Sequence, residues 1–266
     1  MSNQVGALGR VRVEAPLAER VRRASAQFLR FCKRKPMGAL GLFIFVGTMV
    51  VGLFAPFFAT HDPNVQDYTV RLAKPSLSHW LGTDGFGRDL YSRIVWGARI
   101  SLIVAFWSIG MGTVTGFLLG IVSGYFGGWV DNLLQRISEI MLAFPSVLLA
   151  LVLVAIWGAG LTQVVVAISI IFAPRTLRVI RGSVLSVKQN VYVEAARALG
   201  ASHGRIMLRH LLPNVTAPYL IVASTLLGSA IIIEATLSFL GLGVPPPDPS
   251  WGRMLSGGAQ TYAMSA

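Results

Sequence analysis

The sequence predicts an all-α membrane protein that crosses the bilayer several times. Of its 266 residues, 54% are hydrophobic and only 13% are charged, and its mean hydropathy is +0.64. A chain this apolar cannot bury its surface in water as an ordinary domain does, whereas a bilayer is a suitable solvent for it. Its apolar residues also gather in runs of about 20, the length that a helix needs to cross about 30 Å of hydrocarbon.

The first predicted span covers residues 38–58 and the second covers residues 100–123. In the second span glycine recurs at every fourth position, as Gly112, Gly116, Gly120 and Gly124. A spacing of four places these residues on one helical face, where the missing side chains let two backbones approach closely. We interpret this face as a helix-packing surface, and small residues that line a pore are the alternative.

The apolar stretch 140–174 is too long for one crossing, and we expect the Gly-Ala-Gly sequence at 158–160 to fold it into two spans. The second of these either ends near Pro174 or continues as a helix into the basic region beyond it. The last span covers residues 217–240, because the three prolines at 245–247 cannot continue a helix. About five spans are therefore expected.

Basic residues indicate the orientation of these spans. The formal net charge is +12, and an N-terminus in the cytoplasm places 17 of the 23 lysines and arginines on the inner side and 6 on the outer side. The positive-inside rule favours that orientation. The basic runs flank apolar segments without interleaved aromatic residues, so membrane lipids are expected partners and nucleic acid is not. The single cysteine, Cys32, excludes an internal disulfide and a site of several thiolates.

We interpret the first apolar run as a retained anchor, since no small-residue cleavage site follows it. With this anchor retained, the topology divides the chain into five parts. The parts are a basic cytoplasmic N-terminal segment (1–37), the first membrane span (38–58), an external segment (59–99), a transmembrane core that includes a cytoplasmic loop (100–243, with the loop at 175–213) and an external C-terminal tail (244–266).

The external segment carries charged residues of opposite sign at helical spacing. Asp84 precedes Arg88 by four residues, and Asp89 precedes Arg93 by four. Local ion pairs in a short helix or turn are the default interpretation of this pattern. A contact surface for an external substrate-delivery protein is the more specific hypothesis.

The cytoplasmic loop is predicted to form two short helices joined by a glycine. Gly200 ends the first helix, Ser202 caps the second, and the second runs over residues 203–211 and stops before Pro213. One apolar stripe is expected on the first helix, made of Val191, Ala195, Ala198 and Leu199. Such a compact projection, with small side chains at its surface, suits docking into a groove of a motor subunit. An amphipathic loop that lies on the membrane is the alternative.

The loop resembles the EAA loop of bacterial ABC-importer permeases, which it matches at Glu194, Ala195, Ala196, Gly200, Leu212 and Pro213. His210 stands where the general pattern has an apolar residue. A histidine at this position resembles the pattern of the peptide-permease branch. Three further stretches, at 82–89, 234–243 and 249–252, resemble the C-type subunits of dipeptide, oligopeptide and nickel permeases. The resemblance implies that ATPase-subunit coupling falls to Glu194, Ala195, Ala196, Arg197, Gly200, Ile206, His210, Leu212 and Pro213.

The resemblance implies the transmembrane domain of a type I ABC importer in the bacterial inner membrane, with the N-terminus in the cytoplasm. Its expected function is import of di- or oligopeptides by alternating access, and nickel chelates, haem or another small solute are the alternatives. Expected partners are a homologous second permease, two ATP-binding subunits or one fused ATPase, and an external substrate-binding protein. Such permeases usually have a sixth span, so the sequence is expected to be either naturally short or truncated.

The chain is not expected to be an enzyme. It lacks the Gly-x4-Gly-Lys-Ser/Thr pattern of a phosphate-binding loop, so ATP and Mg should bind to partner subunits, and no cofactor or metal is expected on this chain. Glu234 is the one acid well inside a predicted span, which suggests either an interior hydrogen bond or a place in the translocation path. An ATP-independent channel or secondary carrier is the rival function, and the scarcity of such acids counts against it.

Overall fold

The computed structural model describes residue 30 and residues 32–265, and for residues 260–265 the backbone only. The basic segment predicted at 1–37 therefore lies mostly outside the described residues. Within them the chain is helical, without a β-strand. The elements are α2 (Pro36–Leu53), α3 (Ala55–Phe58), the 3-10 turn η1 (Tyr68–Val70), α4 (Leu90–Phe126), α5 (Gly128–Ala143), α6 (Ser146–Trp157), α7 (Leu161–Lys188), α8 (Val191–Ala198), α9 (His203–Ile206), the π turn η2 (Met207–Leu211), α10 (Leu212–Phe239) and α11 (Trp251–Ser265).

Four of the described helices are long and apolar enough to cross a membrane. They are Pro36–Leu53, Leu90–Phe126, Leu161–Lys188 and His203–Phe239. A fifth crossing is reached only if α5 and α6 count as one span, and these two helices meet at an angle of 94°. The predicted all-α, polytopic fold class is confirmed.

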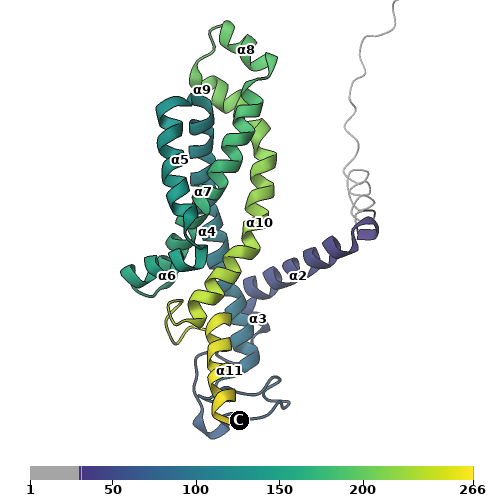
Figure 1. The fold of residues 1–266 in the computed structure, drawn as a ribbon. Helices are drawn as coiled ribbons and strands as arrows, with labels where there is room; N and C mark the ends of the chain where they lie inside the picture. The colour runs from purple at the N-terminus through teal and green to yellow at the C-terminus, as the bar shows by residue number, and fades with distance from the viewer. Residues whose placement is uncertain (1–29, 31, 266) are drawn as a thin grey trace, which may run out of the picture. The chain divides into compact units, whose positions relative to one another are not determined.

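The chain divides into two compact units, residues 1–48 and residues 49–266. In the first, the described part is most of α2, whose apolar side chains are largely exposed, including Met37, Phe43 and Ile44. A helix that is apolar all round and still exposed is suited to lipid or to another apolar helix. Figure 1 shows the helices of the second unit, in which α4, α7 and α10 pack against one another.

The core of the second unit is the contact between α4 and α7. The predicted glycine face of α4 lies on α7, so that a β-carbon on Gly120 would be 2.8 Å from Ile180 Cβ, and one on Gly124 would be 2.8 Å from Val184 Cβ. Gly112 and Gly116 meet the α7 backbone in the same way. Close approach of this kind needs glycine, because any larger side chain would push the helices apart. The face therefore packs two helices and does not line a pore.

Several helix boundaries differ from those expected. Helix α4 begins ten residues before the predicted span, because the carboxylate of Asp89 caps it by accepting a hydrogen bond from the Ser92 N–H at 2.8 Å. The predicted break at 158–160 is present, with Gly158 at φ +90°, and α7 continues through Pro174 as far as Lys188.

The helix before this break is shorter than a span. Helix α6 has only 12 residues, about 18 Å, because the chain already breaks at Phe144. Phe144 precedes Pro145 and is extended, as a residue before proline is expected to be. The stretch expected to form two spans therefore supplies one long helix and one short arm. Residues 251–265, which lie in the predicted external C-terminal tail, form α11.

The glycine contact yields a prediction for unfolding measured on the detergent-purified chain. Gly120→Ala should lower the free energy of unfolding by about 1–3 kcal/mol, because the added methyl group overpacks the contact with Ile180. Gly110→Ala, on the same helix with open space around it, is the matched control and should be neutral or slightly stabilising. Equal effects of the two substitutions would contradict the assignment.

Candidate functional site

The predicted coupling loop forms a compact projection, which we call the α8–α9 loop (residues 189–211). Figure 1 shows it where α4 ends and α5 begins. Three of its side chains are fully buried, namely Val193, Ile206 and Leu211, and they pack in one apolar cluster with Ile180 and Val184 of α7. The loop is therefore seated on the ends of α4 and α7.

Helix α8 ends in a complete Schellman motif. The Ala201 N–H donates to the Ala196 carbonyl at 3.0 Å, and the Gly200 N–H donates to the Arg197 carbonyl at 3.0 Å. Gly200 has φ +77°, a left-handed conformation that glycine adopts without strain. The sequence predicted this helix end, and the motif explains why it requires glycine.

The second short helix differs from its prediction. Ser202 caps α9 as expected, since its hydroxyl accepts a hydrogen bond from the Arg205 N–H at 3.4 Å. The helix does not stop before Pro213. It passes through the π turn η2 and continues as α10, in which Pro213 lies in the first turn. Proline is tolerated there because its missing N–H matters least at a helix start. Helix α9, η2 and α10 thus form one continuous helical path, His203–Phe239.

Tyr125, near the end of α4, connects three elements at this site. Its hydroxyl lies 2.7 Å from Nδ1 of His203 in α9, and its carbonyl accepts a hydrogen bond from Lys188 Nζ of α7 at 2.7 Å. These two contacts tie α9 and the end of α7 to α4. Sequence reasoning missed Tyr125, because its partners are 63 and 78 residues away.

The predicted coupling residues differ in exposure. Glu194, Ala195, Arg197, Gly200 and Pro213 are exposed, Ala196, His210 and Leu212 are half-buried, and Ile206 is buried. Ile206 therefore anchors the loop and cannot itself touch a partner.

The expected apolar stripe on α8 is not the buried face of that helix. Its members Val191, Ala195, Ala198 and Leu199 are exposed, Leu199 at 88%, whereas Val193 faces the core. The apolar stripe of α8 therefore packs against nothing among the described residues, and it is free to contact a partner.

A second missed contact ties α5 to the same place. Asp131 of α5 accepts two hydrogen bonds from the guanidinium group of Arg181 in α7 and one from the Ser123 hydroxyl of α4 at 2.6 Å. Bidentate pairs of this kind are geometrically demanding and hold their partners in a defined orientation. Three helices are therefore fixed next to the α8–α9 loop.

Glu234 lies in α10 and is fully buried against α4. One carboxyl oxygen accepts a hydrogen bond from the Ser101 hydroxyl at 2.9 Å, and the other accepts one from the Ser238 hydroxyl at 2.7 Å. Both oxygens thus have partners inside the protein. This arrangement agrees with the interior hydrogen-bonding role, and Glu234 does not face an open path in this conformation.

The four charged residues predicted to pair around the start of α4 are arranged differently from the prediction. The pair between Asp84 and Arg88 is present, with Arg88 Nε 2.8 Å from the carboxylate. The pair between Asp89 and Arg93 is not formed, because Asp89 turns back to cap α4. Arg93 instead donates to the Pro63 carbonyl at 2.7 Å.

Burial decides which of these four residues remain candidates for contact with a delivery protein. Asp89 and Arg93 are 3% and 2% exposed, so both are withdrawn as contact residues in this conformation. Asp84 and Arg88 keep part of their surface and stay as candidates. Burial raises the pKa of Asp89, but hydrogen bonds from Ser92 and His79 outweigh it, and the pKa lies below its usual range.

The surroundings of Glu234 yield a prediction for stability and transport. Glu234→Ala should lower the free energy of unfolding by about 1–3 kcal/mol, because it leaves two buried serine hydroxyls without their acceptor. Glu139→Ala, which removes a half-exposed acid, is the control and should change stability by less than about 0.5 kcal/mol. Transport by an assembled Glu234→Gln variant should persist, and its loss without loss of stability would instead place Glu234 in the translocation path.

Comparison with known proteins places this geometry in a family. Residues 116–266 match the family described as binding-protein-dependent transport system inner membrane component. Residues 25–75 match the N-terminal TM domain of oligopeptide transport permease C.

Relatives with assigned names agree with these matches. The chain is 42% identical over 228 residues to the dipeptide transport system permease protein DppC of Alkalihalophilus pseudofirmus, covering 86% of this chain and 75% of that protein. It is 41% identical over 228 residues to the glutathione transport system permease protein GsiD of Pectobacterium atrosepticum, covering 85% and 75%. It is 40% identical over 239 residues to the GsiD protein of Escherichia coli O6:K15:H31, covering 90% and 79%.

The predicted resemblance to ABC-importer permeases of the dipeptide and oligopeptide type is confirmed by these matches. The chain is a multi-pass membrane protein, and it belongs to the family of inner membrane permease components of binding-protein-dependent transport systems.

Proposed function

We propose that this chain is the translocating subunit of an ATP-driven importer of di- or oligopeptides, and that its α8–α9 loop receives movement from a separate ATPase. One observation carries the proposal. The loop exposes apolar side chains, Val191 at 80% and Leu199 at 88%, on a base that is fully buried in the helix ends. A rigid apolar projection of this kind fits a groove on a partner protein.

The position of the loop supports a cytoplasmic orientation. Helix α4 has the segment 59–89 at its start and the α8–α9 loop at its end, and its 37 residues make it about 55 Å long. That length exceeds the thickness of a bilayer, so the two regions belong on opposite sides. Arg197, Arg205 and Arg209 lie in the loop and Lys188 ends α7 beside it, and basic residues favour the cytoplasmic side. The segment 59–89 is then outside, where a substrate-binding protein would dock.

Movement of the loop has a direct route into the membrane helices. The buried side chains of Val193 and Ile206 pack in the same apolar cluster as residues of α7. The contact between His203 and Tyr125 joins α9 to α4. The π turn after α9 continues into α10. When nucleotide binding closes the ATPase pair, these contacts would move the three helices together. Alternating access then follows as a switch between two packed arrangements.

The proposed cargo rests on the relatives. One is named a dipeptide permease and two are named glutathione permeases, which supports a small peptide-type solute. A second permease subunit would cover the apolar side chains that α4 leaves exposed, among them Trp107, Met111 and Leu118. ATP and Mg would bind to the ATPase subunits, since this chain lacks a phosphate-binding loop sequence.

Reconstitution tests this proposal. The chain is placed in liposomes with a second permease, ATPase subunits and an external binding protein loaded with dipeptide, glutathione or a nickel chelate. ATP hydrolysis should rise several-fold with the dipeptide-loaded or glutathione-loaded protein and be accompanied by uptake. If only the nickel chelate stimulates ATP hydrolysis, the proposed peptide cargo is wrong. If uptake proceeds without ATP, the proposed ATP-driven mechanism is wrong.

The left-handed Gly200 yields a prediction for coupling. Gly200→Val should reduce uptake at least about tenfold, because a β-branched residue at φ +77° costs more than about 1–2 kcal/mol and distorts the end of α8. Gly200→Asn is the matched control and should keep most of the uptake, since asparagine tolerates this conformation. Both variants are compared for ATP hydrolysis and uptake in the same liposomes. Normal uptake by Gly200→Val would remove the coupling role of the motif.

A further inference from the structure

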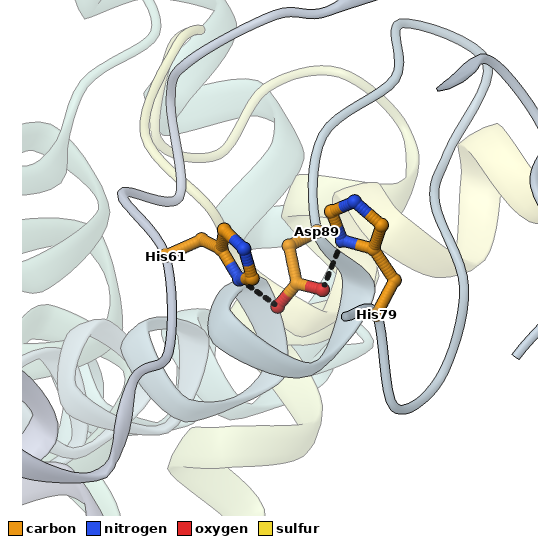
Figure 2. Close-up of side chains that lie close together, drawn as sticks. All are labelled: His61, His79 and Asp89. Carbon is orange, nitrogen blue, oxygen red and sulfur yellow. Dashed lines mark hydrogen bonds and ion pairs between the residues drawn. The ribbon is translucent and has the colours of Figure 1, made fainter. Parts of the chain in front are cut away.

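Two histidines and an aspartate meet at the start of α4, far from the α8–α9 loop. Figure 2 shows the rings of His61 and His79 on either side of the Asp89 carboxylate. One ligand atom from each of the three residues can be chosen so that all lie within 4.8 Å of one another. The three residues come from different segments, since His61 follows α3, His79 lies in the loop after η1, and Asp89 caps α4.

Each of these side chains is held in place by the backbone around it. The carboxylate of Asp89 is 1% exposed and accepts the Ser92 N–H at 2.8 Å. The backbone N–H of His61 donates to the Ser92 hydroxyl at 3.0 Å, which fixes this segment against α4. The backbone of His79 closes a turn with Ser76, whose N–H donates to the His79 carbonyl at 2.8 Å. The arrangement is therefore preorganised and does not depend on flexible side chains alone.

The distances between the donor atoms suit a small cation. Nδ1 of His79 lies 3.0 Å from one Asp89 oxygen, and Nδ1 of His61 lies 3.9 Å from the other. Two ligands on a tetrahedral zinc ion, each about 2.0–2.1 Å from the metal, are about 3.3 Å apart. The two observed separations lie on either side of that value. The longer one exceeds the length of a hydrogen bond and is an ion-pair distance.

The surroundings are also suited to a positive ion. The three residues line a cavity of about 310 Å³, and two further acids, Asp62 and Asp67, border the same cavity. The Thr60 hydroxyl lies 3.0 Å from Nδ1 of His61 and 3.5 Å from an Asp89 oxygen, so an ion bound at that nitrogen would displace the hydroxyl from His61.

We propose that His61, His79 and Asp89 bind one divalent transition-metal ion of the zinc class, with water or another ligand in the fourth position. Two imidazole nitrogens and a carboxylate oxygen form a common three-ligand set for zinc. The bound ion would clamp the segment 59–89 onto the first turn of α4. A simple helix cap explains the contact between Asp89 and Ser92, but it gives no reason for two rings to face the same carboxylate. Sequence reasoning expected no metal, because the ligands are 18, 10 and 28 residues apart and follow no metal-binding spacing.

Metal binding by the full chain, purified without a histidine tag, tests the proposal. The wild-type chain should bind one Zn²⁺, and Co²⁺ in its place should give the intense visible absorption of a tetrahedral site. His61→Gln and His79→Gln should each weaken Zn²⁺ binding at least about tenfold. His203→Gln, which removes a histidine at the other end of α4, is the matched control and should bind Zn²⁺ as the wild type does.

Asp89→Asn separates the metal site from the helix cap, because asparagine caps a helix about as well as aspartate. This variant should keep its melting temperature in a chelator and lose the rise that Zn²⁺ gives the wild type. The proposal is overturned if the wild type binds no Zn²⁺, if its Co²⁺ spectrum is that of the hydrated ion, or if the three ligand variants bind Zn²⁺ as tightly as His203→Gln. The wild-type measurements decide the matter even where a variant fails to fold.

Discussion

The arrangement of this membrane protein depends on the close approach of α4 and α7. In lipid there is no hydrophobic gain from bringing two apolar helices together, so contact has to come from packing. Four glycines on α4 allow that contact over about three turns, and each meets the backbone or a β-branched side chain of α7. The α8–α9 loop is seated on the ends of these two helices. Its position, and with it the proposed route of movement from an ATPase, therefore rests on the glycine contact.

Most of the fold could be predicted from the sequence, because apolar length and helix breakers act locally. The runs of apolar residues predicted the long helices, and the glycines at 158–160 predicted a real break. The predictions that were wrong concern helix ends that depend on the surrounding three-dimensional structure. Pro213 was expected to end a helix, yet the π turn before it lets the chain continue into α10. Asp89 extends α4 beyond its apolar run, which hydropathy cannot reveal.

The candidate site was predicted less completely, since a motif shows which residues matter but not which way they face. The Gly200 turn and the Ser202 cap were predicted because both are local features. The apolar stripe on α8 was predicted, but its orientation was not: Val193, which lies off the stripe, is the buried residue of this helix, and Val191 and Leu199 are exposed. Contacts such as Asp131 with Arg181, or His61 with Asp89, join residues 50 and 28 positions apart. No spacing rule in the sequence indicates such pairs.

The central claim is that the α8–α9 loop faces the ATPase side of the membrane and the segment 59–89 faces the opposite side. Labelling of single cysteines in intact cells tests it most directly, in a Cys32→Ser background with Leu199→Cys or Leu77→Cys, because these side chains are 88% and 98% exposed. A membrane-impermeant maleimide added outside should label position 77 and leave position 199 unmodified until the membrane is opened and the ATPase subunits are stripped off. Labelling of position 199 from outside, with position 77 protected, would contradict the account.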